Sequence, residues 1–133
     1  MGLAAAEPRY GVVGFCWGGT ASFRHAIYAA QSNTPGYGAG VVYYGSAPAP
    51  AELAQAKAPI LGLFGGNDAR VNATLPAADS VLKANGRTHT FAVFDGAGHG
   101  FLRQQDGAGG ANLAASRQAW PQTVAWFRQH LGR

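Results

Sequence analysis

The chain has 133 residues, 47% of them hydrophobic, which is the length of one domain and enough apolar material for a core, so a disordered chain is excluded. The ten Lys and Arg residues give a formal charge of +4 without gathering in a cluster, and we therefore expect no nucleic-acid partner. Residues 1–7 show no targeting signal and no apolar run is long enough to cross a bilayer. We expect a single domain over residues 1–133, no membrane contact and a cytoplasmic location.

In chain order, the first predicted elements are a strand, a tight turn and a helix. The apolar stretch Tyr10–Phe15 leads into Gly-x-Cys-x-Gly-Gly at positions 14–19, and residues 20–30 are compatible with a helix. This arrangement has the form of a nucleophile elbow, in which the central residue sits on a strained strand-to-helix turn. Glycines two positions on either side of Cys16 would leave room for that turn.

Cys16 is the candidate nucleophile of this elbow. It would lie beside a helix N-terminus, where the positive end of the helix dipole favours a thiolate. The amide of Trp17 would point into the same space as an oxyanion donor. The alternative is that Cys16 is a small buried hydrophobic residue, as free cysteines often are. No serine occupies an equivalent position, and a lone cysteine cannot form an intrachain disulfide.

The rest of the chain continues the strand–helix alternation, punctuated by Gly and Pro. Apolar segments at 40–44 and 60–64, and the segment 88–94, are predicted strands. Helices are expected at 51–56 and 75–85, the latter ending at Gly86. The last predicted helix, 112–131, carries large apolar residues on one face at helical spacing: Leu113, Trp120, Val124, Phe127 and Leu131.

Strands that are apolar throughout and separated by helices predict a parallel sheet with helices on both faces. Loops at the carboxyl ends of such strands meet in one crevice. Cys16, Asp68 and His99 each follow a different predicted strand, so we expect them to form one site. There His99 would be the general base and Asp68 would orient its ring. The alternatives are an ordinary loop histidine and a turn-forming aspartate.

Four further residues are weaker candidates. Arg103, four positions after His99, could anchor a substrate carboxylate, or it could be a solvated loop arginine. Trp17, Tyr44 and Phe101 could line an apolar pocket, or they could belong to the core. We expect no metal and no cofactor, because the sequence has no metal-ligand motif and no phosphate-binding loop.

Three blocks of this sequence resemble the dienelactone hydrolase family, the carboxymethylenebutenolidases of the α/β-hydrolase superfamily. The blocks are residues 14–19, 63–71 and 96–101, and residues 119–127 resemble the family's last helix. The likeness runs from about Tyr10 to Leu131. It implies a Cys16, His99 and Asp68 triad that hydrolyses a small ester or lactone through a thioester. Arg103 matches a family arginine that contacts the substrate carboxylate.

The resemblance covers only the carboxyl-terminal half of the family's domain. The missing half would supply the first strands, a glutamate beside the resting cysteine, a second substrate arginine and the second oxyanion amide. We therefore expect a partial α/β-hydrolase fold of about four parallel strands with an unpaired edge. A second copy or a complementing chain could cover that edge. The competing hypothesis is a non-catalytic half-domain that assembles through it.

Overall fold

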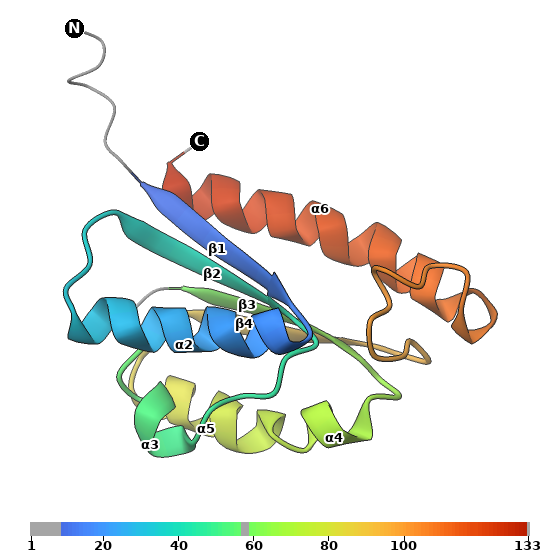
Figure 1. Cartoon of the computed structure of the whole chain (residues 1–133), viewed down its shortest axis with the longest axis horizontal. Coiled ribbons are helices and arrows are strands. Elements are labelled where there is room, and N and C mark those ends of the chain that lie inside the picture. The colour runs from blue at the N-terminus through green and yellow to red at the C-terminus, as the bar shows by residue number, and fades with distance from the viewer. Residues whose placement is uncertain (1–8, 57–58, 133) are drawn as a thin grey trace, which may run out of the picture.

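The computed structural model describes residues 9–56 and 59–132, which form one parallel sheet with helices on both faces (Figure 1). Residues 1–7, which carry the prediction about targeting, lie outside the described residues. The strands are β1 (Tyr10–Phe15), β2 (Tyr37–Tyr43), β3 (Ile60–Gly65) and β4 (His89–Phe94), and they lie in that order across the sheet. Every pair of neighbouring strands is parallel. The predicted fold class is confirmed.

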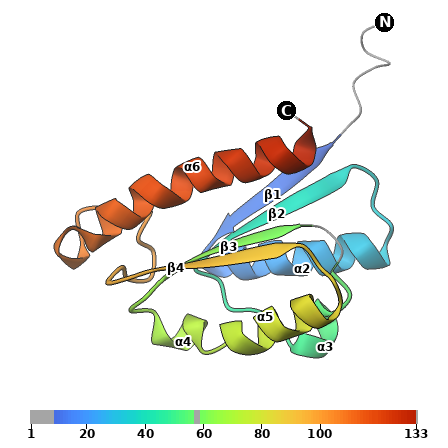
Figure 2. The ribbon, with the colours of Figure 1, turned by 180° about the vertical axis from the view of Figure 1, so that it is seen from behind.

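The helices divide into two layers. On one face lie α2 (Trp17–Gln31), the short α3 (Pro50–Leu53) and α5 (Leu75–Ala84), with α4 (Ala69–Asn72) between β3 and α5. The other face is covered by α6 (Ala111–Leu131), which follows the 3₁₀ turn η1 (Ala108–Gly110). Figure 2, seen from behind, shows the same separation of α6 from the remaining helices. The sheet is therefore the middle of three layers.

Alternating side chains of the central strands divide the core into two clusters. In β3, Ile60 and Phe64 face α2, α3 and α5. Leu61 and Leu63 of the same strand pack in the cluster beneath α6. All four side chains are buried, so β3 is covered on both faces, as expected for a central parallel strand.

The predicted apolar face of α6 is only partly the buried one. Small and polar residues make the closest approach to the sheet: Asn112, Ala115, Ser116, Ala119 and Thr123 are buried. Phe127 packs over Gly11, where an added Cβ would lie 2.3 Å from its ring. Trp120, in contrast, is half-exposed. Large residues on this helix therefore flank the contact, because the sheet lies too close to admit them at its centre.

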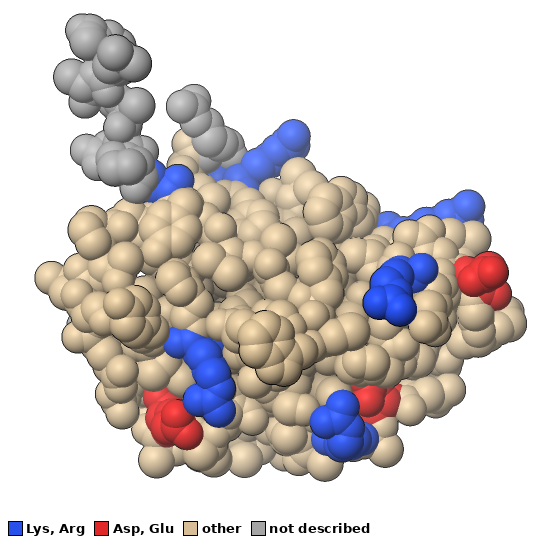
Figure 3. Space-filling view, viewed as in Figure 1, with Lys and Arg blue, Asp and Glu red and all other residues tan. Residues whose placement is uncertain are grey.

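Strand β1 forms one edge of the sheet and has a single strand neighbour among the described residues, β2. Within residues 9–56 and 59–132, this side of the sheet thus has the unpaired edge that the sequence predicts. Figure 3 shows that the face over β1 and α2 is mostly uncharged, with a few scattered basic and acidic side chains. Coverage of this edge by a second copy or another chain stays a prediction.

Candidate active site

Cys16 lies at the junction of β1 and α2, on a strained turn. Its backbone has φ 57° and ψ −121°, in a region that side-chain-bearing residues rarely adopt. The turn is held by two hydrogen bonds: the Cys16 N–H donates to the Tyr43 carbonyl at 3.0 Å, and the Gly19 N–H donates to the Cys16 carbonyl at 2.9 Å. The local geometry is that of a nucleophile elbow.

Of the two glycines that the sequence predicts for this turn, the structure requires one, and the second required glycine is the neighbour of the other. A Cβ added to Gly14 would lie 1.8 Å from the Gly18 carbonyl oxygen, so a side chain there is excluded, as predicted. Gly18, expected to be the second obligatory glycine, has open space around it. The crowded position is Gly19, whose added Cβ would lie 2.6 Å from the Tyr43 carbonyl oxygen. The requirement falls on Gly19 because its Cα lies against the backbone of Tyr43 and Gly45.

Asp68 and His99 form a close pair on the loops that follow β3 and β4. The Nδ1 atom of His99 lies 2.5 Å from Oδ2 of Asp68, where a protonated Nδ1 donates to the carboxylate. The carboxylate is buried, whereas the imidazole side chain is 40% exposed. The two loops are also joined through their backbones, because the Asn67 N–H donates to the Ala97 carbonyl at 3.0 Å. The pair therefore leaves Nε2 as the ring nitrogen available to a ligand.

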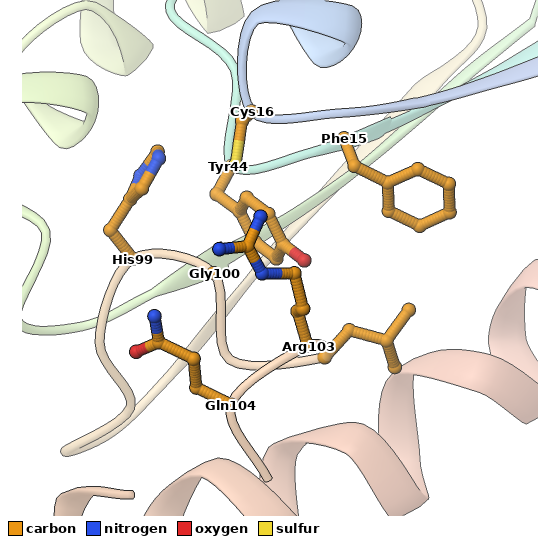
Figure 4. Close-up of a pocket in the computed structure, with 8 residues that line it drawn as sticks. Phe15, Cys16, Tyr44, His99, Gly100, Arg103 and Gln104 are labelled. Atoms are coloured by element: carbon orange, nitrogen blue, oxygen red, sulfur yellow. The ribbon is translucent and has the colours of Figure 1, made fainter.

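Cys16 and His99 line the same cavity of about 490 Å³ (Figure 4). Its walls come from the end of β1, the end of β2 and the loop after β4: Phe15, Cys16, Tyr44, His99, Gly100, Leu102, Arg103 and Gln104. Among the described residues, no hydrogen bond joins the Cys16 sulfur to the His99 ring.

Tyr44 and Arg103 lie where the sequence places a substrate pocket. Both line this cavity, and Figure 4 shows the Arg103 side chain extending from its loop into it. Burial, and then the charge of a Cys16 thiolate nearby, raise the pKa of Tyr44 to about 12. Tyr44 therefore keeps its phenolic proton at neutral pH.

Phe101 and Trp17 differ from that arrangement. Phe101 is fully buried and does not line the cavity; its ring packs behind Tyr44, with centroids 5.1 Å apart. The next residue, Leu102, takes the place in the wall instead. The side chain of Trp17 is 84% exposed. Its backbone N–H is the first of α2, where helical amides have no partner within the helix.

Two polar residues of α6 hold the loop that carries His99 and Arg103, and sequence reasoning missed both. The side chain of Asn112 accepts a hydrogen bond from the Gly98 N–H at 2.9 Å and donates to the Gln104 carbonyl at 2.8 Å. Ser116 donates to the Phe101 carbonyl at 3.1 Å. The available signal was a polar face on a helix that is predicted to be apolar. Buried polar groups need hydrogen-bond partners, so such a face indicates contacts of this kind.

Residues 9–56 and 59–132 contain neither a cluster of metal ligands nor a helix suited to a membrane. No group of three or more His, Cys, Asp or Glu side chains in this part of the chain could hold a metal ion. No helix within it is long and apolar enough to traverse a bilayer.

The sheet order, the elbow and the strand-end loops together define an α/β-hydrolase fold. The fold is similar to that of the acylaminoacyl peptidase of Pyrococcus horikoshii, which superposes with a TM-score of 0.73 at 16% identity, over 96% of this chain and 25% of that one. The dienelactone hydrolase family model matches residues 4–131, and the chain belongs to that family.

Individual relatives are similar to this chain over part of their length. A Methylorubrum extorquens protein assigned by name as a carboxymethylenebutenolidase is 35% identical over 92% of this chain and 43% of its own length. A solved Klebsiella pneumoniae structure titled as a dienelactone hydrolase gives a TM-score of 0.75 at 27% identity, over 90% of this chain and 52% of that one. The chain thus spans about half the length of these relatives.

Proposed function

We propose that this chain hydrolyses a small ester or lactone, with Cys16 as nucleophile, His99 as general base and Asp68 as the group that orients the ring. One observation carries the proposal: the elbow cysteine and an imidazole paired with a buried carboxylate line one cavity. The order nucleophile, acid, histidine is that of α/β-hydrolases. The assignment of a relative as a carboxymethylenebutenolidase favours a lactone among the substrates.

The first half of the reaction would transfer the acyl group to sulfur. His99 removes the thiol proton, and the sulfur adds to the carbonyl carbon, whose oxygen becomes an anion that accepts a hydrogen bond from the Trp17 N–H. When this intermediate collapses, the carbon–oxygen bond breaks and His99 returns the proton to the leaving oxygen. The product is a thioester on Cys16. For a lactone, the leaving oxygen stays attached to the acyl group.

The second half would release the acid. His99 removes a proton from water, the resulting hydroxide adds to the thioester carbon, and the carbon–sulfur bond breaks. The proton returns to the sulfur, so the resting enzyme is restored. Asp68 would hold the tautomer of His99 and stabilise its cation in both halves. Arg103 and Tyr44 would contact the substrate from the cavity wall.

Alkylation of Cys16 tests this proposal directly, because it is the only cysteine in the chain. Iodoacetamide should label it in the folded protein and abolish turnover of 4-nitrophenyl acetate and of dienelactone. C16A, compared with the wild type in the same screen, measures background hydrolysis. Full turnover after complete alkylation would exclude Cys16 as the nucleophile.

A second candidate function has the free edge of β1 in its favour. The described residues give β1 one strand neighbour, and the side chains of Phe15 and Trp17 are exposed beside it. Such an edge is a template for pairing with another strand. On this hypothesis the chain is a non-catalytic half-domain that works as an assembly piece. It predicts a dimer or larger species without esterase activity, whereas an active monomer in size-exclusion chromatography would rule it out.

A further inference from the structure

A second hollow, of about 260 Å³, opens beside the first cavity and shares three of its residues, Cys16, Tyr44 and His99. Its remaining walls come from the start of α2, the loop after β2 and α4: Trp17, Thr20, Ser46, Arg70 and Val71. The thiol therefore stands between two arms of one site. We call the arm that contains Arg103 the first arm and the arm that contains Arg70 the second arm.

The two arms differ in their lining but have one feature in common. The first arm places the apolar side chains of Phe15 and Leu102 around Arg103. The second arm has the polar side chains of Thr20 and Ser46 around Arg70. Each arm thus contains one guanidinium, a group suited to binding a carboxylate with two hydrogen bonds.

The backbone that carries Arg70 is fixed on two sides. The Asn72 side chain donates to the Gly65 carbonyl at 2.8 Å, which ties α4 to the end of β3. The Thr74 hydroxyl accepts from the Ala47 N–H at 3.0 Å, which ties the turn between α4 and α5 to the loop after β2. Arg70 therefore projects from an anchored turn, although its own side chain is exposed.

The charge of Arg70 is available to a ligand. Among the described residues, no carboxylate lies within ion-pair distance of its guanidinium. Asp68, the nearest acid in the sequence, is buried and paired with His99. The second arm thus offers a cation and polar groups without an internal anion to neutralise them.

We propose that the second arm is a carboxylate-binding subsite, and that the preferred substrates carry one carboxylate on each side of the scissile bond. Arg103 holds one carboxylate and Arg70 holds the other, with the carbonyl over Cys16 between them. This inference rests on the proposed function, because only a hydrolase would turn the bound molecule over as a substrate. The binding of a dicarboxylate across the two arms does not itself require turnover.

Protection of Cys16 from alkylation tests the subsite without any substrate. Iodoacetamide modification is followed by mass spectrometry in the presence of glutarate, butyrate or glutaramide. Glutarate should protect at a concentration about twofold to fivefold lower than butyrate, the range expected for one additional exposed guanidinium–carboxylate contact. The neutral diamide should not protect.

Matched variants assign the effect to a residue. R70Q should abolish the advantage of glutarate over butyrate, and R70K should retain part of it. R128Q removes the same charge from an exposed position on α6 and should leave the advantage intact. The subsite is excluded if glutarate keeps its full advantage over butyrate in R70Q. It is also excluded if glutarate has no advantage over butyrate in the wild type. Circular dichroism confirms that each variant is folded.

A pair of ester series then separates this inference from the proposed function. One series carries a carboxylate or a carboxamide on the leaving phenol, and the other carries the same two groups on the acyl chain. R70Q and R103Q should each lower kcat/KM for the carboxylate member of a different series. Absence of turnover in all four compounds would contradict the hydrolase proposal alone, because the protection result stands independently. Loss of the same preference in both variants would contradict two separate subsites.

Discussion

Among the described residues, two histidines pair with carboxylates, and the two pairs differ in which partner is buried. At the carboxyl ends of the strands, Asp68 is 8% exposed and His99 is 40% exposed, with Nδ1 and Oδ2 2.5 Å apart. In the second pair, His89 at the start of β4 is 6% exposed, while Asp79 of α5 is 41% exposed; Nε2 and Oδ1 are 2.7 Å apart. The contacts are of similar length, so distance does not distinguish the pairs.

The difference lies in what the second ring nitrogen does. In His89 it faces the Arg87 carbonyl at 3.2 Å, and the ring packs edge-on against Phe91. In His99 the second nitrogen belongs to a ring that lines the cavity with Cys16. A general base needs a free nitrogen within reach of the reacting proton. The comparison indicates that a buried carboxylate with an open ring is suited to proton transfer, whereas a buried ring with an open carboxylate is suited to structure.

The largest expected difference between the two pairs is in catalysis. D68N keeps the shape of the side chain but removes the charge that orients and stabilises His99, so kcat should fall about 10³- to 10⁴-fold. D79N makes the same chemical change in the other pair and should leave kcat within about twofold, since Asp79 does not line the cavity. Both values come from steady-state assays of the ester that the wild type turns over best.

Equal losses in D68N and D79N would show that the pairs are not functionally distinct. A D68N variant with wild-type kcat would remove Asp68 from the proposed triad. Thermal unfolding of both variants separates a catalytic effect from loss of the folded state.

The sequence predicts the sheet well because each strand has a local signature. The predicted strand 60–64 matches β3 to within one residue, and 88–94 matches β4 equally well. The strand predicted at 40–44 begins earlier in the structure, at Tyr37. The prediction placed its start too late because the glycines at 38 and 40 weaken the strand pattern there. Helix α4 was missed because four residues are too few to show a helical period.

The site is predictable where it depends on topology and not where it depends on side-chain direction. Parallel strands place the loops of Cys16, Asp68 and His99 at one edge, and the structure brings Asp68 and His99 into contact. Whether Phe101 or Leu102 faces the cavity depends on the path of the loop, which no local pattern specifies. The hydrogen bonds of Asn112 to the His99 loop and the second arm at Arg70 arise from tertiary contacts, and no sequence motif marks either of them.

Variants of Asn112 test whether the Asp68–His99 pair needs the loop of His99 to be held in place. Its side chain bonds both Gly98 and Gln104, at the two ends of the segment that carries His99. N112A should lower kcat/KM by about 10- to 100-fold, because a displacement of about 1 Å in a catalytic group has effects of this size. N112D keeps the acceptor for Gly98 but sets a buried carboxylate oxygen against the Gln104 carbonyl, so its loss should be at least as large as that of N112A.

A pH–rate profile and a KM determination for N112A show whether Asn112 acts by positioning the His99 loop or only by stabilising the fold. If Asn112 acts by holding the loop, N112A should lower kcat at temperatures well below its unfolding midpoint. Wild-type kcat in folded N112A would contradict the positioning role. S116A, which removes the hydroxyl contacts with the Phe101 and Asn112 carbonyls but leaves the Asn112 side chain in place, provides an intermediate variant.

The buried ring of the other pair should matter for stability instead. H89Q removes the hydrogen bond to Asp79 and the packing against Phe91, and should lower the free energy of unfolding by about 1–2 kcal/mol. The rate of Cys16 alkylation should be unchanged. Urea denaturation measures the first effect and mass spectrometry the second. An H89Q variant as stable as the wild type would contradict a structural role for this pair.

The smallest effect expected is the pH dependence that Asp79 contributes. The hydrogen bond from His89, with Lys83 as a further contribution, holds the pKa of the Asp79 carboxyl below its usual value of 3.8. A carboxyl whose pKa is lower in the folded state stabilises the fold above its unfolded pKa, and this contribution disappears as the pH falls through the folded pKa. D79N should therefore be slightly less stable than the wild type at pH 6, and the difference should shrink below pH about 3.8. Urea denaturation at both pH values measures this change. A difference that stays constant down to pH 3 would show that Asp79 stabilises the pair through shape rather than charge.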